Sequence, residues 1–172
     1  DCLVVKKHIK TLKDLKGKTI VLQAYGPHVD FLVLVLESVG FTINDVNIKY
    51  VKDLTATDNT PVEAFYEEDV DAAFVIIPDG QLLTEGDNAV PGARILMSTK
   101  TMDHAIADLY AVRKDYYEAN RDKVEKLVFG LMSAEQKLRG LVKKNQWDET
   151  KKVAAQIMLQ DTGPQALADT EG

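Results

Sequence analysis

The sequence predicts an α/β fold: a mostly parallel five-stranded sheet with helices on both faces, followed by a C-terminal helical segment. Three observations support this fold class. Short apolar runs of strand length recur along the first two thirds of the chain, and helix-initiating residues separate several of them. The last third instead shows apolar residues at three- and four-residue steps. We therefore expect an α/β ligand-binding lobe over residues 1–113 and amphipathic helices over 114–172.

The first elements form a strand, helix, strand unit. Residues 19–23 form an apolar run typical of a buried strand, and residues 27–39 read as a helix with Pro27 in its first turn and Gly40 after its end. A strand over 31–36 is the competing interpretation, because a short apolar run has no decisive period. The strand-like segment 47–51 favours the helix, since a parallel pair needs a crossover.

The pattern then repeats. Thr60 begins a capping-box sequence, with Pro61 in the first turn, that predicts a helix through Glu68. A third strand is expected at 72–77, ended by a turn at Pro78, Asp79 and Gly80. Further strands are predicted at 94–97 and 107–112. A short apolar stretch, Cys2 to Val5, precedes all of these elements.

Two helices follow in the remainder of the chain. From Asp115 onward only helices are expected. One long amphipathic helix is predicted, with an apolar face that carries the following residues: Val124, Leu127, Val128, Leu131, Leu138, Leu141 and Val142. A second helix is predicted over 148–160, with Val153, Ile157 and Met158 facing inward. Such a helical tail needs a surface on which to pack.

Composition excludes several classes of function. The chain has 172 residues, 45% of them hydrophobic, and a formal net charge of -6, so it predicts a packed domain without a basic stripe for nucleic acid. Cys2 is the single cysteine, which excludes an internal disulfide and a CxxC pair. The chain opens without an export leader and carries no apolar run long enough to span a bilayer, so we expect it to be soluble. Its two ends suggest an excised piece.

Catalytic motifs are lacking. The sequence has no GxSxG elbow, no phosphate-binding P-loop and no GxGxxG. The three histidines are far apart, with no pair at metal-ligand spacing. We therefore expect neither enzyme activity nor a cofactor or metal.

Candidate binding residues lie where strands of a parallel sheet end, because ligands bind beyond the carboxyl ends of such strands. The loop at 24–28 offers Tyr25 to stack or donate, Gly26 to let a ligand approach, and His28 to donate from a helix N-terminus. Two features weaken an anion site at this loop, because Pro27 has no N–H to donate and Asp30 adds negative charge. The alternative to a ligand site is that Pro27 and Asp30 only start the helix and that His28 is a surface residue. Further candidates come from later loops: Asp79, Thr101 and His104.

Several short motifs resemble, in their order and spacing, the second lobe of type 2 periplasmic substrate-binding proteins of ABC importers. The group with the greatest similarity comprises nitrate, sulfonate and taurine binders and the thiamine-pyrimidine-precursor proteins. The resemblance covers most of Leu3 to Trp147 and rests on the following residues: 14–20 (DLKGKTI), Gly40-Phe41, Asp45-Val46, Ala64-Phe65, 70–73 (VDAA), Pro78, 109–116 (LYAVRKDY) and Asn120.

The resemblance implies a clamshell protein that closes on a small polar or anionic solute and presents it to an ABC permease, in the periplasm or another extracytoplasmic compartment. It also implies that the loops at Tyr25–His28 and after Pro78 face the ligand. The family's first lobe is absent, and Leu3 to Val5 resembles the crossing strand. One lobe buries too little of a ligand for tight binding, since tight sites bury about 70 to 90% of it.

Two alternatives stay open. One is an interaction or sensory module, in which the apolar 31–36 helix or the helical tail supports self-association or a partner. The other is an enzyme of the pyrimidine-precursor type, which is disfavoured because that group carries a cysteine-rich motif and this chain has only Cys2.

Overall fold

A computed structural model describes residues 1–102, 105–106, 109–158 and 163. The chain forms two compact units, Asp1–Leu109 and Tyr110–Gly172. The division into units reflects only which residues pack together. The domain boundary that the sequence predicts between residues 113 and 114 therefore stays a prediction. Within the described residues, no helix is both long and apolar enough to cross a membrane.

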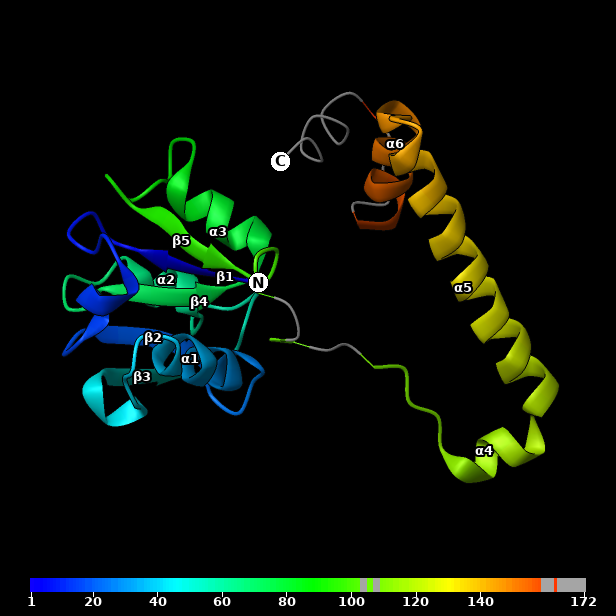
Figure 1. Ribbon diagram of the computed structural model, residues 1–172, viewed down its shortest axis with the longest axis horizontal. Helices are drawn as coiled ribbons and strands as arrows, with labels where there is room; N and C mark the ends of the chain where they lie inside the picture. Colours follow the sequence, from blue (N-terminus) through cyan, green and yellow to red (C-terminus); the bar gives the residue numbers. More distant parts are fainter. Residues whose placement is uncertain (103–104, 107–108, 159–162, 164–172) are drawn as a thin grey trace. The chain divides into compact units, whose positions relative to one another are not determined.

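The first unit contains a five-stranded sheet with the strand order β3-β2-β4-β1-β5 (Figure 1). Strands β2, β3, β4 and β5 run parallel to one another, and β1 is antiparallel to both of its neighbours, β4 and β5. The predicted mostly parallel sheet is therefore confirmed. The strands have these bounds: β1 Cys2–Val5, β2 Thr19–Gln23, β3 Asn47–Val51, β4 Ala72–Val75 and β5 Arg94–Ser98.

The fifth strand is not the one that the sequence pattern predicts. Residues 109–112 have no regular structure, and Leu109 and Tyr110 are almost fully exposed; residues 107 and 108 lie outside the described part. The alternation of apolar residues there finds no partner strand to pair with. Cys2–Val5 completes the sheet instead, as a fully buried strand inserted between β4 and β5.

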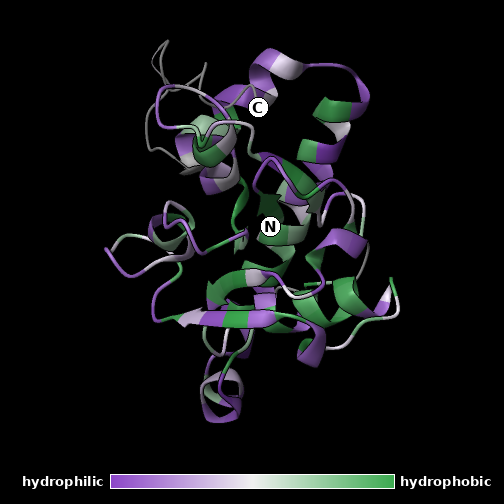
Figure 2. Cartoon of the chain, turned by 90° about the vertical axis from the view of Figure 1, so that its left-hand side faces the viewer, coloured by the Kyte–Doolittle hydropathy of each residue, from purple (hydrophilic) through white to green (hydrophobic). Residues whose placement is uncertain are grey.

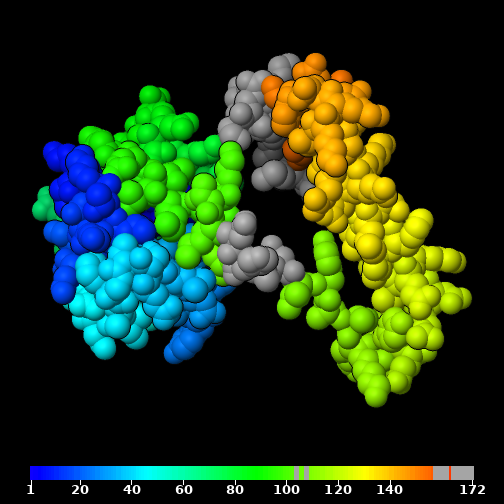
Figure 3. Space-filling view, in the orientation of Figure 1, coloured from blue at the N-terminus to red at the C-terminus, as the bar shows by residue number. Residues whose placement is uncertain are grey.

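Helices cover both faces of the sheet because alternate strand residues point to opposite sides. One core contains Leu3, Ile20 and Phe74 together with residues of α1 (His28–Glu37). The other contains Cys2 and Val21 with residues of α2 (Pro61–Phe65) and α3 (Ile77–Thr84). Figure 2 shows that most residues of the central strands are hydrophobic. In Figure 3 the segments coloured blue to green pack as one continuous body.

The helices α2 and α3 begin in different ways: a side chain caps α2, whereas α3 has a proline in its first turn. Thr60 accepts a hydrogen bond from the Glu63 N–H at 3.3 Å, which is the Thr60 half of the predicted capping box. The segment Pro78–Gly80, expected to be a turn, lies instead in the first turn of α3, with Pro78 in a position that needs no N–H donor. A proline directly after a predicted strand is compatible with either a turn or the first turn of a helix, so the sequence alone did not distinguish the two at Pro78.

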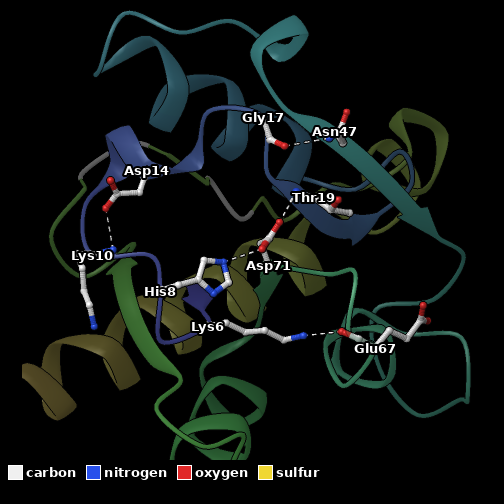
Figure 4. Close-up of polar contacts among 9 residues, drawn as sticks. All are labelled: Lys6, His8, Lys10, Asp14, Gly17, Thr19, Asn47, Glu67 and Asp71. Atoms are coloured by element: carbon white, nitrogen blue, oxygen red, sulfur yellow. Dashed lines mark hydrogen bonds and ion pairs between the residues drawn. The ribbon is translucent and has the colours of Figure 1, made fainter.

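Polar contacts close the sheet at the edge where β2, β3, β4 and β5 begin, which we call the amino edge (Figure 4). Asp71 accepts a hydrogen bond from the Thr19 N–H at 2.9 Å, and His8 Nε2 lies 2.7 Å from its other carboxylate oxygen. The Asn47 side chain donates to the Gly17 carbonyl at 3.1 Å. These contacts connect the starts of β2, β3 and β4, at the edge of the sheet opposite to the one where these strands end.

The second unit is helical. It contains α4 (Lys114–Ala119), α5 (Arg121–Lys143) and α6 (Trp147–Met158). The long amphipathic helix that we predict, with Val124 to Val142 on its apolar face, is confirmed as α5, and the short helix α4 precedes it with Asn120 between the two. Along α5 several apolar side chains are largely exposed: Leu127 at 62%, Phe129 at 74% and Met132 at 66%.

Candidate functional site

The carboxyl edge, where β2, β3, β4 and β5 end at Gln23, Val51, Val75 and Ser98, brings together most of the predicted binding loops. Tyr25 follows β2 by two residues and Asp79 follows the neighbouring β4 by four, so both leave the sheet at this edge. Asp1 also lies there, because β1 is antiparallel and Cys2 pairs with both Val75 and Ser98.

A hollow of about 590 Å³ opens at this edge beside the ends of β2 and β3, and we call it the tyrosine hollow. Tyr25 stands fully in solvent at 103% exposure, and Tyr50 is 54% exposed. The hollow is lined by Ala24, Tyr25, Gly26, Val29, Asp30 and Tyr50. Two aromatic rings and one carboxylate therefore face a common space.

The backbone around Tyr25 has an unusual conformation. Tyr25 has a φ of 57°, in the left-handed region that costs a residue with a Cβ about 1 to 2 kcal/mol. At the next residue, a Cβ atom added to Gly26 would lie 2.8 Å from Gln23 Oε1, the far end of a flexible side chain that can turn away. The loop is held to the sheet because the Ala24 N–H donates to the Val51 carbonyl at 2.8 Å. The fold thus holds an aromatic side chain outward at a conformational cost.

A second hollow, of about 340 Å³, lies beyond the end of β3, and we call it the threonine hollow. It is lined by Thr55, Ala56, Thr57, Thr60, Val62, Glu63, Asp79 and Leu82. The Asp79 Oδ2 atom is buried and accepts no hydrogen bond from the described residues. Burial raises the pKa of the Asp79 carboxyl. Asp79 and Tyr25 therefore share an edge of the sheet but line different hollows.

His28 does not lie on the surface. Its side chain is fully buried, with Nε2 2.9 Å from Asp1 Oδ1 and the ring centroid 6.0 Å from that of Phe74. Burial and, to a smaller extent, the positive amino group of Asp1 together lower the pKa of His28 to about 4. The surface-residue alternative is therefore wrong, and the imidazole is neutral at neutral pH. Its role toward a ligand stays a prediction, since it lines neither hollow.

The remaining candidates are less informative. Thr101 is exposed, and its hydroxyl donates to the Ser98 carbonyl at 3.1 Å just beyond β5. His104 lies outside the described residues. Tyr50 was not among the predicted site residues, although the signal was present: it precedes the buried Val51 by one residue in β3 and therefore points to the opposite side. No three His, Cys, Asp or Glu side chains in the described ranges are grouped to hold a metal ion.

Comparison with known proteins identifies the family. The family model described as NMT1/THI5 like matches residues 2–139, which is most of the chain. The chain belongs to the NMT1/THI5-like family. This match confirms the resemblance inferred from the sequence motifs. A comparison with curated protein sequences finds no match to this chain.

Solved structures show that this NMT1/THI5-like chain shares a known fold. The alkanesulfonate-binding protein SsuA from Xanthomonas axonopodis pv. citri, bound to MOPS, matches with a TM-score of 0.63 and 23% identity over 98% of this chain and 53% of its own. The periplasmic aliphatic sulphonate binding protein SsuA from Escherichia coli matches with a TM-score of 0.66 and 21% identity over 97% of this chain and 49% of its own. The chain thus spans about half the length of these proteins.

Proposed function

We propose that the chain is part of the solute-binding component of an ABC-type importer and holds a small polar solute non-covalently at its carboxyl edge. The observation that carries this proposal is the pair of open hollows at that edge, where parallel sheets bind their ligands. Family membership and the sulfonate-binding relatives of the same fold support it. The proposal includes a periplasmic or other extracytoplasmic location, a permease as partner, and no catalytic step.

The chain alone should bind its solute weakly. Both hollows open to solvent along one side of the unit, whereas sites for small molecules enclose about 70 to 90% of a tightly bound ligand. The chain also covers only about half the length of the two sulfonate-binding proteins whose structures it matches. We therefore expect dissociation constants in the millimolar range for this chain, about 4 kcal/mol of binding free energy.

The test is a titration of the ¹⁵N- and tyrosine-labelled chain, followed by NMR, with a panel of sulfonates, nitrate, amino acids, amines and pyrimidines. A solute should shift resonances of Tyr25, Gly26 and Tyr50 and leave those of the amino edge, such as Thr19, unchanged. Saturating concentrations of every panel member without any shift at the carboxyl edge would contradict the proposal.

A second candidate function is self-association through the helical unit. Its supporting observation is the exposed apolar face of α5, where Phe129 and Met132 line a shallow hollow. The other arm of this alternative, the apolar segment 31–36, is wrong as a docking surface, because Phe31, Leu32, Val35 and Leu36 are fully buried in the core. Light scattering after size exclusion separates the two candidates. A dimer that Phe129→Glu converts to a monomer would favour self-association, whereas a monomer at all concentrations would exclude it.

A further inference from the structure

We propose that the tyrosine hollow takes a small organic cation, a substituted ammonium group with an apolar body, and discriminates against anionic solutes. This inference rests on the proposed solute-binding function and names its substrate class. It follows from the side chains that line the hollow, from the carboxylates in the linings of both hollows, and from the lack of lysine and arginine in those linings.

The first observation is the pair of tyrosines. Tyr25 and Tyr50 both line the hollow, and both expose more than half of their side chains. Aromatic faces attract ammonium groups through the ring quadrupole, and aromatic-lined sites are the usual means by which proteins hold quaternary ammonium ligands. Tyr25 has a left-handed backbone, and its side chain lies fully in solvent. Strain of this kind concentrates at ligand-binding positions.

The second observation is the sign of the charge. Asp30 lines the tyrosine hollow, and Glu63 and Asp79 line the threonine hollow at the same edge. Among the described residues, neither lining contains a lysine or an arginine. The buried Asp79 Oδ2 is an acceptor that receives no hydrogen bond from the described part of the chain. The linings of the two hollows therefore offer negative charge and acceptors, which suit a cation that carries N–H or O–H donors.

The third observation concerns anions. The N-terminus of α1 is the feature of this loop most suited to an anion, but Pro27 has no N–H there and Asp30 in the first turn repels negative charge. His28 offers no positive charge at neutral pH, because it is buried, with Nε2 2.9 Å from Asp1 Oδ1 and its pKa lowered to about 4. An anion at this loop would consequently meet a carboxylate without a compensating positive side chain.

The experiment compares three probes of similar size on the full 172-residue chain at constant ionic strength. Choline chloride supplies the cation, 3,3-dimethyl-1-butanol is its neutral isostere, and sodium methanesulfonate is the anion. Choline should shift the ring resonances of Tyr25 and Tyr50, and the neutral isostere should bind about twofold to fivefold more weakly, as expected for loss of an exposed cation–π contact. Methanesulfonate should shift neither ring.

Variants identify the groups responsible. Asp30→Asn should weaken choline binding about twofold to fivefold and leave the neutral isostere unchanged, since only the charge is lost. Tyr25→Ala should weaken choline by a similar factor. Glu37→Gln, which removes an exposed carboxylate at the far end of the same helix, is the matched control and should change nothing.

The outcomes separate this inference from the proposed function. Equal binding of choline and its neutral isostere, or shifts caused by methanesulfonate, would overturn the cation assignment while leaving solute binding at this edge intact. Absence of a choline effect, with another panel solute binding at the same resonances, would also overturn it. Failure of every panel solute to bind would remove both proposals together.

Discussion

Gly80 of α3 packs directly against the thiol of Cys2 on β1: a Cβ atom added to Gly80 would lie 2.5 Å from the Cys2 Sγ atom. The next neighbours of that added atom, in Ile95 and Val4, would lie at ordinary contact distances of 3.5 and 3.6 Å. The sulfur atom alone therefore prevents a side chain at this helical position. Glycine sets how closely α3 approaches the sheet, and thereby where Asp79, its sequence neighbour, is placed.

Gly80→Ala should lower the free energy of unfolding by about 1 to 3 kcal/mol, because overpacking of a well-packed core costs this much. In a Cys2→Ala background the same substitution should instead be neutral or stabilising by up to about 1 kcal/mol, since alanine is the better helix former. A double-mutant cycle from urea unfolding measures this coupling. Equal effects in both backgrounds would show that the sulfur contact is not the cause.

The Cys2 thiol should be nearly inert in the folded chain. It is fully buried, and burial raises its pKa to about 11. At pH 8 roughly a thousandth of the thiol is thiolate, the form that reacts. Alkylation by iodoacetamide, followed by mass spectrometry, should be at least a hundredfold slower without denaturant than in 6 M guanidinium. Comparable rates in the two conditions would contradict the buried position of β1.

Stability should fall in mild acid because of His28. Its folded pKa of about 4 is below the unfolded value of 6.5, so the unfolded chain binds the proton first as the pH falls. The stabilisation is complete above pH 6.5, is lost progressively down to pH 4 and amounts to up to about 3 kcal/mol. The Asp1 carboxylate beside Nε2 works against this loss.

Urea unfolding at pH 7.5, 6 and 5 measures the effect of His28. The slope with pH should be reduced in His28→Gln and retained in His8→Gln, which alters an exposed histidine at the amino edge. Parallel pH profiles for the wild type and His28→Gln would refute the assignment, whatever the absolute stability of the variant.

Tyr25→Gly should separate stability from binding. The ring makes no packing contact to lose at 103% exposure, and glycine relieves the left-handed strain, so the free energy of unfolding should rise by about 0.5 to 1 kcal/mol. Binding at the tyrosine hollow should weaken because the ring is gone. Tyr25→Ala is the control, which should lose binding without the gain in stability. A stability loss in Tyr25→Gly would show that the ring packs on the protein.

Asp71→Ala should destabilise the sheet without touching the site. The variant leaves the partly buried Thr19 N–H without its side-chain acceptor and removes the partner of His8, at a cost of about 1 to 3 kcal/mol. Thermal unfolding measures the loss, and Asp87→Ala, at an exposed loop position, is the control. Solute-induced shifts at Tyr25 should persist in Asp71→Ala at temperatures where it is folded, since Asp71 lies at the amino edge.

Much of the fold follows from local signals. The bounds of β2 and β3 agree with the prediction residue for residue, because each is an extended run bounded by turn residues. The helix α1 was distinguishable from a strand only through the crossover that parallel pairing requires. In contrast, α3 was missed because Pro78 and Gly80 are typical of turns, and the glycine is explained by a contact with Cys2, which is 78 positions away in the sequence.

The candidate site was predictable to a smaller extent. The rule that ligands bind beyond strand ends located Tyr25 and Asp79, and the structure places both at the carboxyl edge. It did not show that they line separate hollows, nor that Tyr50 faces the first of these. The alternative that His28 is a surface residue was wrong, because the packing of α1 on Phe74 buries its side chain, whereas its predicted role toward a ligand stays a prediction.

By itself the sequence determined β2, β3 and α1 and their parallel crossover, and the edge at which ligands are expected, because these depend on periodicity, turn chemistry and chain connectivity. Only the tertiary structure decided that Cys2–Val5 is the inserted antiparallel strand, that His28 is buried, and that Tyr25 and Tyr50 share a hollow with Asp30. These features depend on contacts between residues distant in sequence, whose energies no local pattern records.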